Sequence, residues 1–242
     1  MSEKAFLSIV IPAYKEARRI HKSLDAIVDY EKEHKFALEV LIVLDGTPDN
    51  TLTIVEEYRG KLKNLRIIDR KENRGKGYTV RQGVQEAKGE YILFTDADNA
   101  TPIDQVDKLL KYKDEFEVII GSRYILGGRM AVPQSLVRKL GGRVLNLIIQ
   151  ILAVGGIEDT QCGFKLFRHD AAKEIFKRMT FERFSFDIEI LAIARIHKYK
   201  IKEVGITWYD DPHSTVSPIK DGLIMVRDAW RISRNRAKGV YK

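Results

Sequence analysis

The chain has 242 residues, of which 44% are hydrophobic, and 42 Lys and Arg residues against 34 Asp and Glu residues give a formal net charge of +8. This composition excludes a disordered polymer, and a chain of this length buries roughly 70% of the surface that its unfolded form exposes. The single cysteine, Cys162, excludes an intramolecular disulfide and a cysteine-rich zinc site, and it favours a reducing compartment such as the cytoplasm. The positive charge predicts an anionic partner, which could be nucleic acid, an acidic membrane surface or a phosphorylated small molecule.

No segment of the sequence predicts a signal peptide or a membrane-spanning helix. The apolar stretch that begins at Leu7 is short and its flank is weakly charged, unlike a signal peptide. The longest apolar stretch, Val144–Val154, contains Asn146 and Gln150 and is well short of the roughly 20 residues that cross a bilayer.

In the first half of the chain, apolar runs of strand length alternate with amphipathic stretches of helix length. This alternation predicts an α/β fold with a mostly parallel, twisted sheet flanked by helices. The segment Asp45–Asn50 contains Gly and Pro and ends in good helix N-caps, so it separates a strand from a helix. The expected strands are Leu7–Ile11, Glu39–Leu44, Leu65–Ile68, Tyr91–Phe94 and Val118–Ile120, and the expected helices are Glu16–His34, Asn50–Tyr58, Lys76–Glu86 and Ile103–Tyr112.

After Gly121 the alternation is less regular. No repeat, low-complexity tract or linker interrupts the chain, so the sequence predicts a single domain over residues 1–242. The expected elements are a Gly- and Arg-rich loop over Gly121–Pro133, a helix to about Val154, a strand at Phe164–Phe167, helices at Ala171–Arg178 and Phe186–His197, a strand at Lys202–Trp208 and a C-terminal helix.

The residues that follow the predicted strands are candidates for a binding site, because ligands of an open α/β sheet bind outside the carboxyl ends of its strands. Two carboxylates two residues apart, such as Asp96 and Asp98, can hold one Mg²⁺ or Mn²⁺ ion whose other ligands are water and phosphate oxygens. By itself an Asp-x-Asp triplet is weak evidence, since it also arises by chance and as helix N-caps. The candidates are Pro12, Ala13, Tyr14 and Glu16 after the first strand, Asp45 after the second, and Asp96, Ala97 and Asp98 after the fourth.

Lys76 lies between two glycines at the start of a predicted helix. The segment is not a Walker loop, because the spacing before the lysine is wrong. It is either a turn that opens the helix or a basic approach to a phosphate at the helix N-terminus, and the sequence favours neither.

Several of these segments together resemble glycosyltransferase family 2, whose fold is called GT-A. The resemblance extends from about Ser8 to Arg234 and is most specific in the nine residues Asp159–Phe167, here called the Asp159 run. That run resembles the dolichyl-phosphate glucosyltransferase branch, with the dolichyl-phosphate mannose synthases as near relatives. The segments that carry the resemblance are Ser8–Glu16, Asp45, Asn73–Gly77, Asp96–Asp98, Gly121–Arg123, the Asp159 run and Phe184–Glu189.

The resemblance implies an inverting transfer of a hexosyl group from a nucleotide sugar to dolichyl or polyprenyl phosphate. It favours UDP-glucose as the donor, with GDP-mannose close behind, and a divalent metal, Mg²⁺ or Mn²⁺, as cofactor. It divides the chain into a nucleotide-sugar-binding half at about 1–121 and an acceptor-binding half at about 122–242. The nucleotide-sugar contacts that it implies are Pro12, Ala13, Tyr14, Glu16, Asp45, Lys76, Asp96, Ala97 and Asp98, of which Asp96 and Asp98 bind the metal. It implies that Arg123 and Arg138 bind the lipid phosphate and that Asp187 and Glu189 lie near the sugar. The catalytic residues that it implies are Asp98, Arg123, Asp187 and Glu189.

The sequence departs from the family pattern in the segment Asp211–Val216. Here His213 stands in place of a Gly and Thr215 in place of a Lys, so one expected cation over the diphosphate is missing. His213 either replaces that cation or is a solvent-facing loop residue. Two further expectations come from residue chemistry: Cys162 is a packing residue, and Glu189 faces the cleft because an unpaired buried carboxylate is costly.

Two basic, amphipathic helices predict binding to an anionic membrane surface. On the C-terminal helix, basic side chains lie within about 40° of one line along the helix and are flanked by Leu223, Val226 and Trp230. A second basic cluster precedes the apolar helix Val144–Val154. The basic residues are Lys220, Arg227, Arg231, Arg234 and Lys238 on the first helix, and Arg129, Arg138, Lys139 and Arg143 before the second. The alternative for each helix is a solvated charged face over a packed side.

The leading hypothesis is therefore a glycosyltransferase that acts from a nucleotide sugar onto a polyprenyl phosphate. We expect it to be cytoplasmic and peripheral at the cytoplasmic face of a membrane. A family 2 transferase with a soluble acceptor is the second hypothesis. A nucleic-acid-binding module is the third and has only the positive charge in its favour, so we expect no nucleic-acid partner. The sequence leaves open the polyprenol, the number of subunits and the need for a membrane-protein partner.

Overall fold

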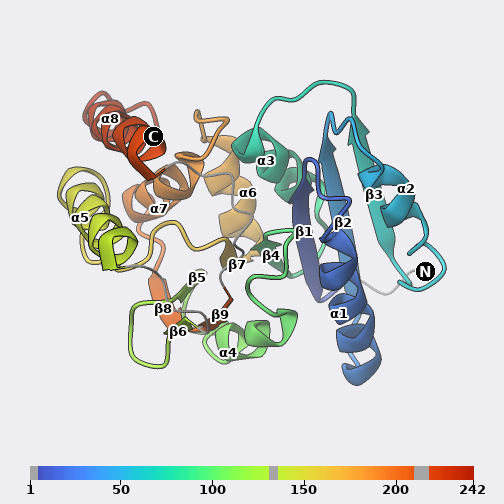
Figure 1. Ribbon diagram of the computed structural model, residues 1–242. Coiled ribbons are helices and arrows are strands. Elements are labelled where there is room, and N and C mark those ends of the chain that lie inside the picture. Colours follow the sequence, from blue (N-terminus) through green and yellow to red (C-terminus); the bar gives the residue numbers. More distant parts are fainter. Residues whose placement is uncertain (1–4, 131–135, 210–217) are drawn as a thin grey trace.

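A seven-stranded sheet forms the centre of the computed structural model, which describes residues 5–130, 136–209 and 218–242 (Figure 1). The strand order is β3-β2-β1-β4-β7-β5-β8. β7 is antiparallel to β4 and β5 on either side of it, and the other neighbouring strands are parallel, which confirms the predicted mostly parallel sheet. The strands are β1 (Leu7–Ala13), β2 (Leu38–Asp45), β3 (Leu65–Arg70), β4 (Tyr91–Thr95), β5 (Val118–Ser122), β7 (Phe164–Arg168) and β8 (Ile201–Gly205).

Helices cover both faces of this sheet, which is why the central strands are mostly apolar. One face packs against α1 (Ile20–Glu33), α2 (Thr51–Glu56) and α4 (Val106–Leu110), which a short 3₁₀ turn, η1 (Ile103–Gln105), precedes. The other face packs against α3 (Lys76–Glu86), α6 (His169–Lys177) and α7 (Phe186–Ile196). All residues of β1 and β2 are buried between these layers.

Two further helices, α5 (Leu136–Leu152) and α8 (Pro218–Ala237), pack against each other outside α7 (Figure 1). Ile149 of α5 and Ile232 of α8 are buried in the same apolar core as α7. Within the described residues, no helix is long and apolar enough to cross a membrane.

The structure differs from the predicted elements mainly at their ends. The first helix begins at Ile20 instead of Glu16, because residues 16–19 form a turn in which Ile20 N donates to Glu16 O. The strand predicted over Lys202–Trp208 is interrupted at Ile206. Its second part, β9 (Thr207–Trp208), pairs with β6 (Arg129–Met130) in a separate two-stranded sheet, where the sequence predicted a loop.

Candidate active site at the carboxyl edge of the sheet

The segment after β1 is attached to the segment after β2 by backbone donors. Lys15 N donates to Thr47 Oγ1 at 2.9 Å and Glu16 N to Thr51 Oγ1 at 3.0 Å. These bonds hold the predicted nucleotide-binding segment at the carboxyl edge of the sheet. Within it, Pro12 and Ala13 end β1 and are buried, Glu16 is half-buried, and Tyr14 is exposed.

Asp45 ends β2 and organises the loop that precedes α3. Its carboxylate accepts hydrogen bonds from Arg74 N and Gly75 N, both at 2.8 Å, and forms an ion pair with Arg70. Gly75 has a φ of 103°, and an added Cβ would lie 2.6 Å from Glu182 O, so this position requires glycine. Asp45 therefore positions the start of α3, and its predicted contact with the nucleotide sugar stays a prediction.

Asp96 and Asp98 follow β4, and Asp96 lies beside the Asp159 run. Asp96 N donates to Gly163 O at 3.2 Å, and a Cβ at Gly163 would overlap the Asp96 carboxylate. The intervening Ala97 is buried, and its carbonyl accepts from Ser23 Oγ at 2.8 Å. The most specific segment of the sequence thus lies directly against Asp96, one of the two predicted metal-binding aspartates.

We predict that Gly163→Ala lowers activity much more than stability. The added methyl group displaces the Asp96 carboxylate, which can move because its side chain is 34% exposed. A misplacement of about 1 Å at a reacting centre costs roughly 10²-fold in rate. Sugar-transfer kinetics and thermal unfolding measure the two effects, and Gly60→Ala is the control, because a Cβ there meets nothing within 4 Å. Equal activity of the two variants would contradict the proposed role of Gly163.

Positive side chains lie next to both aspartates. Lys76 Nζ is 2.6 Å from Asp96 Oδ1, and Arg19 Nη1 is 3.6 Å from Asp98 Oδ2. Arg19 also forms an ion pair with Glu16. Burial alone would lower the pKa of Lys76, but the negative charges of Asp96 and Asp187 outweigh burial and raise it. The pKa of Asp98 is also raised, first by burial and then by the charge of Asp96. The two carboxylates therefore form a site where additional positive charge is stabilising.

Asp187, in the first turn of α7, is buried and paired with Lys165 of β7. Lys165 is fully buried, and its Nζ also donates to Cys162 O at 2.5 Å. Burial raises the pKa of Asp187, and Lys165 and then Lys76 oppose that rise. The sequence reasoning missed Lys165, although a lysine within the apolar strand Phe164–Phe167 was a usable signal of a buried ion pair.

The expectation that Glu189 faces the cleft is wrong. Glu189 is fully buried, and its carboxylate accepts from Thr180 Oγ1 at 2.6 Å, Thr180 N at 2.9 Å and Phe181 N at 2.8 Å. These three hydrogen bonds offset the cost of burying the carboxylate, so Glu189 needs no contact with the cleft. Glu189 therefore holds the turn after α6, on a different face of α7 from Asp187.

Arg123 follows β5 and forms a bidentate ion pair with Asp159. Arg123 Nε lies 2.7 Å from Asp159 Oδ2, and Nη2 lies 2.8 Å from Oδ1. The guanidinium also lies 5.0 Å from the centre of the Trp208 ring. Its predicted contact with the lipid phosphate stays a prediction. The side chain of Arg138 and all of His213 and Thr215 lie outside the described residues.

Cys162 is buried in the Asp159 run, and burial raises the pKa of its thiol to about 12. We predict that native protein does not react with a disulfide reagent between pH 7 and pH 9, because the thiolate is the reactive form. Spectroscopic titration with and without denaturant measures this. One thiol released only after unfolding is the expected result, and rapid release from the folded protein would contradict the packing role.

The described side chains do not by themselves complete a metal site. Within residues 5–130, 136–209 and 218–242, no group of three or more His, Cys, Asp or Glu side chains is placed to hold a metal ion. Asp96 and Asp98 supply two carboxylates, which fits a hard cation that takes its other ligands from water and phosphate oxygens.

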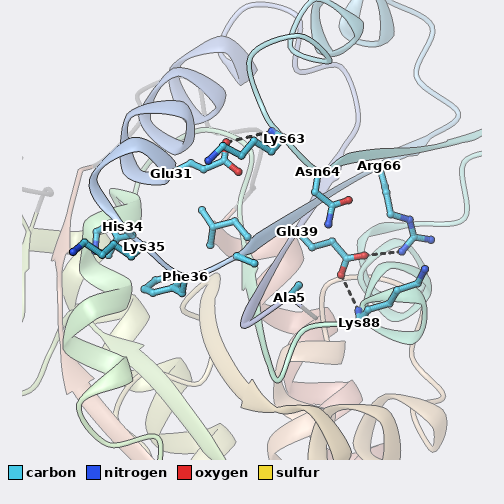
Figure 2. A pocket seen from close by; sticks show the side chains of 12 residues that line it. Ala5, Glu31, His34, Lys35, Phe36, Glu39, Lys63, Asn64, Arg66 and Lys88 are labelled. Atoms are coloured by element: carbon cyan, nitrogen blue, oxygen red, sulfur yellow. Dashed lines mark hydrogen bonds and ion pairs between the residues drawn. The ribbon is translucent and has the colours of Figure 1, made fainter. Parts of the chain in front are cut away.

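A cavity of about 620 Å³ lies at the opposite, amino edge of the sheet and contains none of the predicted site residues (Figure 2). Its buried Glu39 accepts from Arg66 Nη1 at 2.9 Å and Lys88 N at 2.8 Å. Burial opposes ionisation of Glu39, but hydrogen bonds from Ser8, Lys88 and Arg66 outweigh it and lower the pKa. The cavity is therefore separate from the candidate active site.

Comparison with known proteins shows the family of the chain. The model of the family described as "Glycosyl transferase family 2" matches residues 8–176. The chain therefore belongs to glycosyltransferase family 2. It is similar to the dolichyl-phosphate beta-glucosyltransferases of Homo sapiens (34% identity, 95% of this chain, 79% of the relative) and Saccharomyces cerevisiae (34%, 99% and 78%). The corresponding protein of Dictyostelium discoideum is 33% identical over 99% of this chain and 77% of its own length.

Solved structures confirm the fold. Mannosyl-3-phosphoglycerate synthase from Rubrobacter xylanophilus superimposes with a TM-score of 0.71 at 17% identity, covering 97% of this chain and 75% of that one. Glucosyl-3-phosphoglycerate synthase from Mycobacterium tuberculosis, in complex with UDP, gives 0.66 at 16% identity, covering 96% and 80%. The predicted GT-A fold is confirmed, and these distant likenesses show the fold alone.

Proposed function

We propose that this protein transfers glucose from UDP-glucose to dolichyl phosphate or a related polyprenyl phosphate, with inversion at the anomeric carbon. The observation that carries the proposal is the position of the Asp159 run, whose Gly163 lies against Asp96. The likeness to dolichyl-phosphate beta-glucosyltransferases over 95–99% of the chain supports glucose as the sugar and dolichyl phosphate as the acceptor.

In this reaction an acceptor phosphate oxygen bonds to the anomeric carbon as the bond from that carbon to the nucleoside diphosphate breaks. The acceptor is already anionic at neutral pH, so it needs orientation more than a general base. Arginines suit that task because a guanidinium binds phosphate oxygens in pairs, and Arg123 and Arg138 are our candidates. Asp187, held by Lys165, is the candidate for a contact with the sugar.

We also propose a divalent metal, Mg²⁺ or Mn²⁺, held by Asp96 and Asp98. When bound, such an ion stabilises the negative charge that develops on the leaving diphosphate. The paired carboxylates, with the pKa of Asp98 raised by burial and by Asp96, support this assignment. Lys76 supplies a further positive charge beside Asp96.

We propose that the protein lies at the cytoplasmic face of a membrane through α5 and α8. Both helices carry exposed apolar side chains, and basic residues of α8 accompany them, as in helices that lie in a membrane interface. The exposed apolar residues are Val144, Leu147 and Ile151 on α5 and Leu223, Ile224 and Trp230 on α8. Flotation with anionic and neutral vesicles tests this proposal, and equal binding of Leu147→Glu/Ile151→Glu and wild-type protein would contradict it.

An acceptor comparison tests the proposed reaction. Purified protein is incubated with labelled UDP-glucose and Mn²⁺ in the presence of dolichyl phosphate, dolichol or a soluble glycan. Label extracted into organic solvent only with dolichyl phosphate is the expected result. Label that stays in the aqueous phase on a glycan would contradict the proposal and favour a family 2 transferase with a soluble acceptor.

A further inference from the structure

The ammonium group of Lys76 lies on one of the two carboxylates proposed to bind the metal. Lys76 Nζ is 2.6 Å from Asp96 Oδ1 and 5.5 Å from the centre of the Phe94 ring. The neighbouring charges of Asp187 and Asp98 also favour the protonated amine. The site therefore contains a positive charge of its own before any ligand arrives.

The Lys76–Asp96 ion pair can exchange its partners, unlike the nearby Lys165–Asp187 pair. The side chains of Lys165 and Asp187 are 0% and 7% exposed, whereas those of Lys76 and Asp96 are 25% and 34% exposed. The Lys76–Asp96 pair is partly open to solvent, although Asp96 Oδ1 itself is buried, so breaking this pair does not leave both charges in a dry interior.

The main chain around Lys76 is fixed, so an exchange involves only the side chain. A Cβ at Gly77 would lie 2.7 Å from Phe181 O, and Tyr78 N donates to Glu182 O at 3.1 Å. The start of α3 is thus packed against residues 181–186. From this fixed base, the four-carbon stem of Lys76 carries a mobile point charge.

We propose that Lys76 is a built-in counter-ion that alternates between Asp96 and the diphosphate of the donor. Without nucleotide, its ammonium holds Asp96 and repels a divalent cation from the same carboxylate. A bound diphosphate attracts the ammonium and releases Asp96 for the metal. The metal and the nucleotide then bind cooperatively, because each favours the arrangement that the other needs. This inference rests on the proposed function for the identity of the two ligands.

Binding of Mn²⁺, followed by the resonance signal of the free ion, tests the inference at pH 8, with and without UDP. The variants are Lys76→Gln, Lys76→Arg and, as a matched loss of one charge, Lys88→Gln at the amino edge of the sheet (Figure 2). Without UDP, Lys76→Gln is expected to bind Mn²⁺ at least about ten-fold more tightly than wild type, the size of effect that one nearby charge has on a carboxylate. UDP should tighten Mn²⁺ binding strongly in wild type, Lys76→Arg and Lys88→Gln, and only weakly in Lys76→Gln.

Two results would overturn the inference. If Lys76→Gln binds Mn²⁺ without UDP no more tightly than wild type while wild type transfers sugar, the counter-ion role is wrong and the proposed function stands. If no variant binds Mn²⁺ even with UDP, the counter-ion role and the metal requirement are both wrong. Thermal unfolding of Lys76→Gln shows whether the variant is folded in either case.

Discussion

Replacement of Asp98 by Ala is expected to lower sugar transfer by roughly 10²–10³-fold, the usual cost of losing one group that stabilises charge in a transition state. Asp98 lies beside Asp96 and Arg19, and burial and then the charge of Asp96 raise its pKa, so a bound cation would stabilise its ionised form. Removal of the carboxylate therefore weakens the binding of that cation. Initial rates at saturating donor, over a series of Mn²⁺ concentrations that starts below the wild-type requirement, measure the effect.

Asp114→Ala is the matched control for this experiment. Asp114 is exposed and pairs only with its neighbour Lys113 among the interactions of the described residues. Its loss should leave transfer unchanged. A wild-type rate in Asp98→Ala would remove the metal-binding role of Asp98 from the proposed mechanism.

Replacement of Lys165 by Met is expected to destabilise the fold by about 3–5 kcal/mol, because it leaves the buried carboxylate of Asp187 without its partner. Lys165 is fully buried, and it contacts Asp187 and Cys162 O at the centre of the sheet. Unfolding in urea measures the free energy of unfolding. Lys173→Met serves as a comparison, because it removes a half-buried lysine on α6 at a site away from Asp187.

The double variant Lys165→Met/Asp187→Asn separates stability from catalysis. Without the buried negative charge, it should recover a large part of the stability that Lys165→Met loses. Its transfer rate should remain low, since Asp187 is proposed to contact the sugar. Recovery of both stability and full activity would show that the ion pair has only a structural role.

The strands could be predicted from the sequence because burial on both faces makes them mostly apolar. β1 and β2 are the clearest cases, since every residue of both is buried. The break at Ile206 could not be predicted. It depends on which strand each half of the segment meets, β5 in the main sheet or β6 in the small one, and apolar periodicity carries no information on such pairing.

In the candidate active site, too, some residues could be predicted from the sequence, whereas their partners could not. Asp45, Asp96 and Asp98 were predictable because they lie at or just past the carboxyl ends of buried strands, and parallel strands bring these ends to one edge. The partners of these residues come from distant segments. Gly163 and Lys165 reach Asp96 and Asp187 only because β7 inserts antiparallel between β4 and β5.

Glu189 shows a further limit of sequence reasoning. A carboxylate on an apolar helix needs partners, but the sequence does not say whether they are solvent, ligand or protein. In the structure they are the backbone N–H groups of Thr180 and Phe181 and the hydroxyl of Thr180. Backbone donors have no sequence pattern, so only the fold of the turn after α6 could identify them.

A comparison of two donors tests the central claim most directly. Wild-type protein and Asp98→Ala are each incubated with dolichyl phosphate, Mn²⁺ and either labelled UDP-glucose or labelled GDP-mannose, with a chelator in a parallel series. The account predicts organic-phase label from UDP-glucose with wild type alone, lost with the chelator. Label from GDP-mannose instead, or label from UDP-glucose that persists in Asp98→Ala with the chelator, would contradict it.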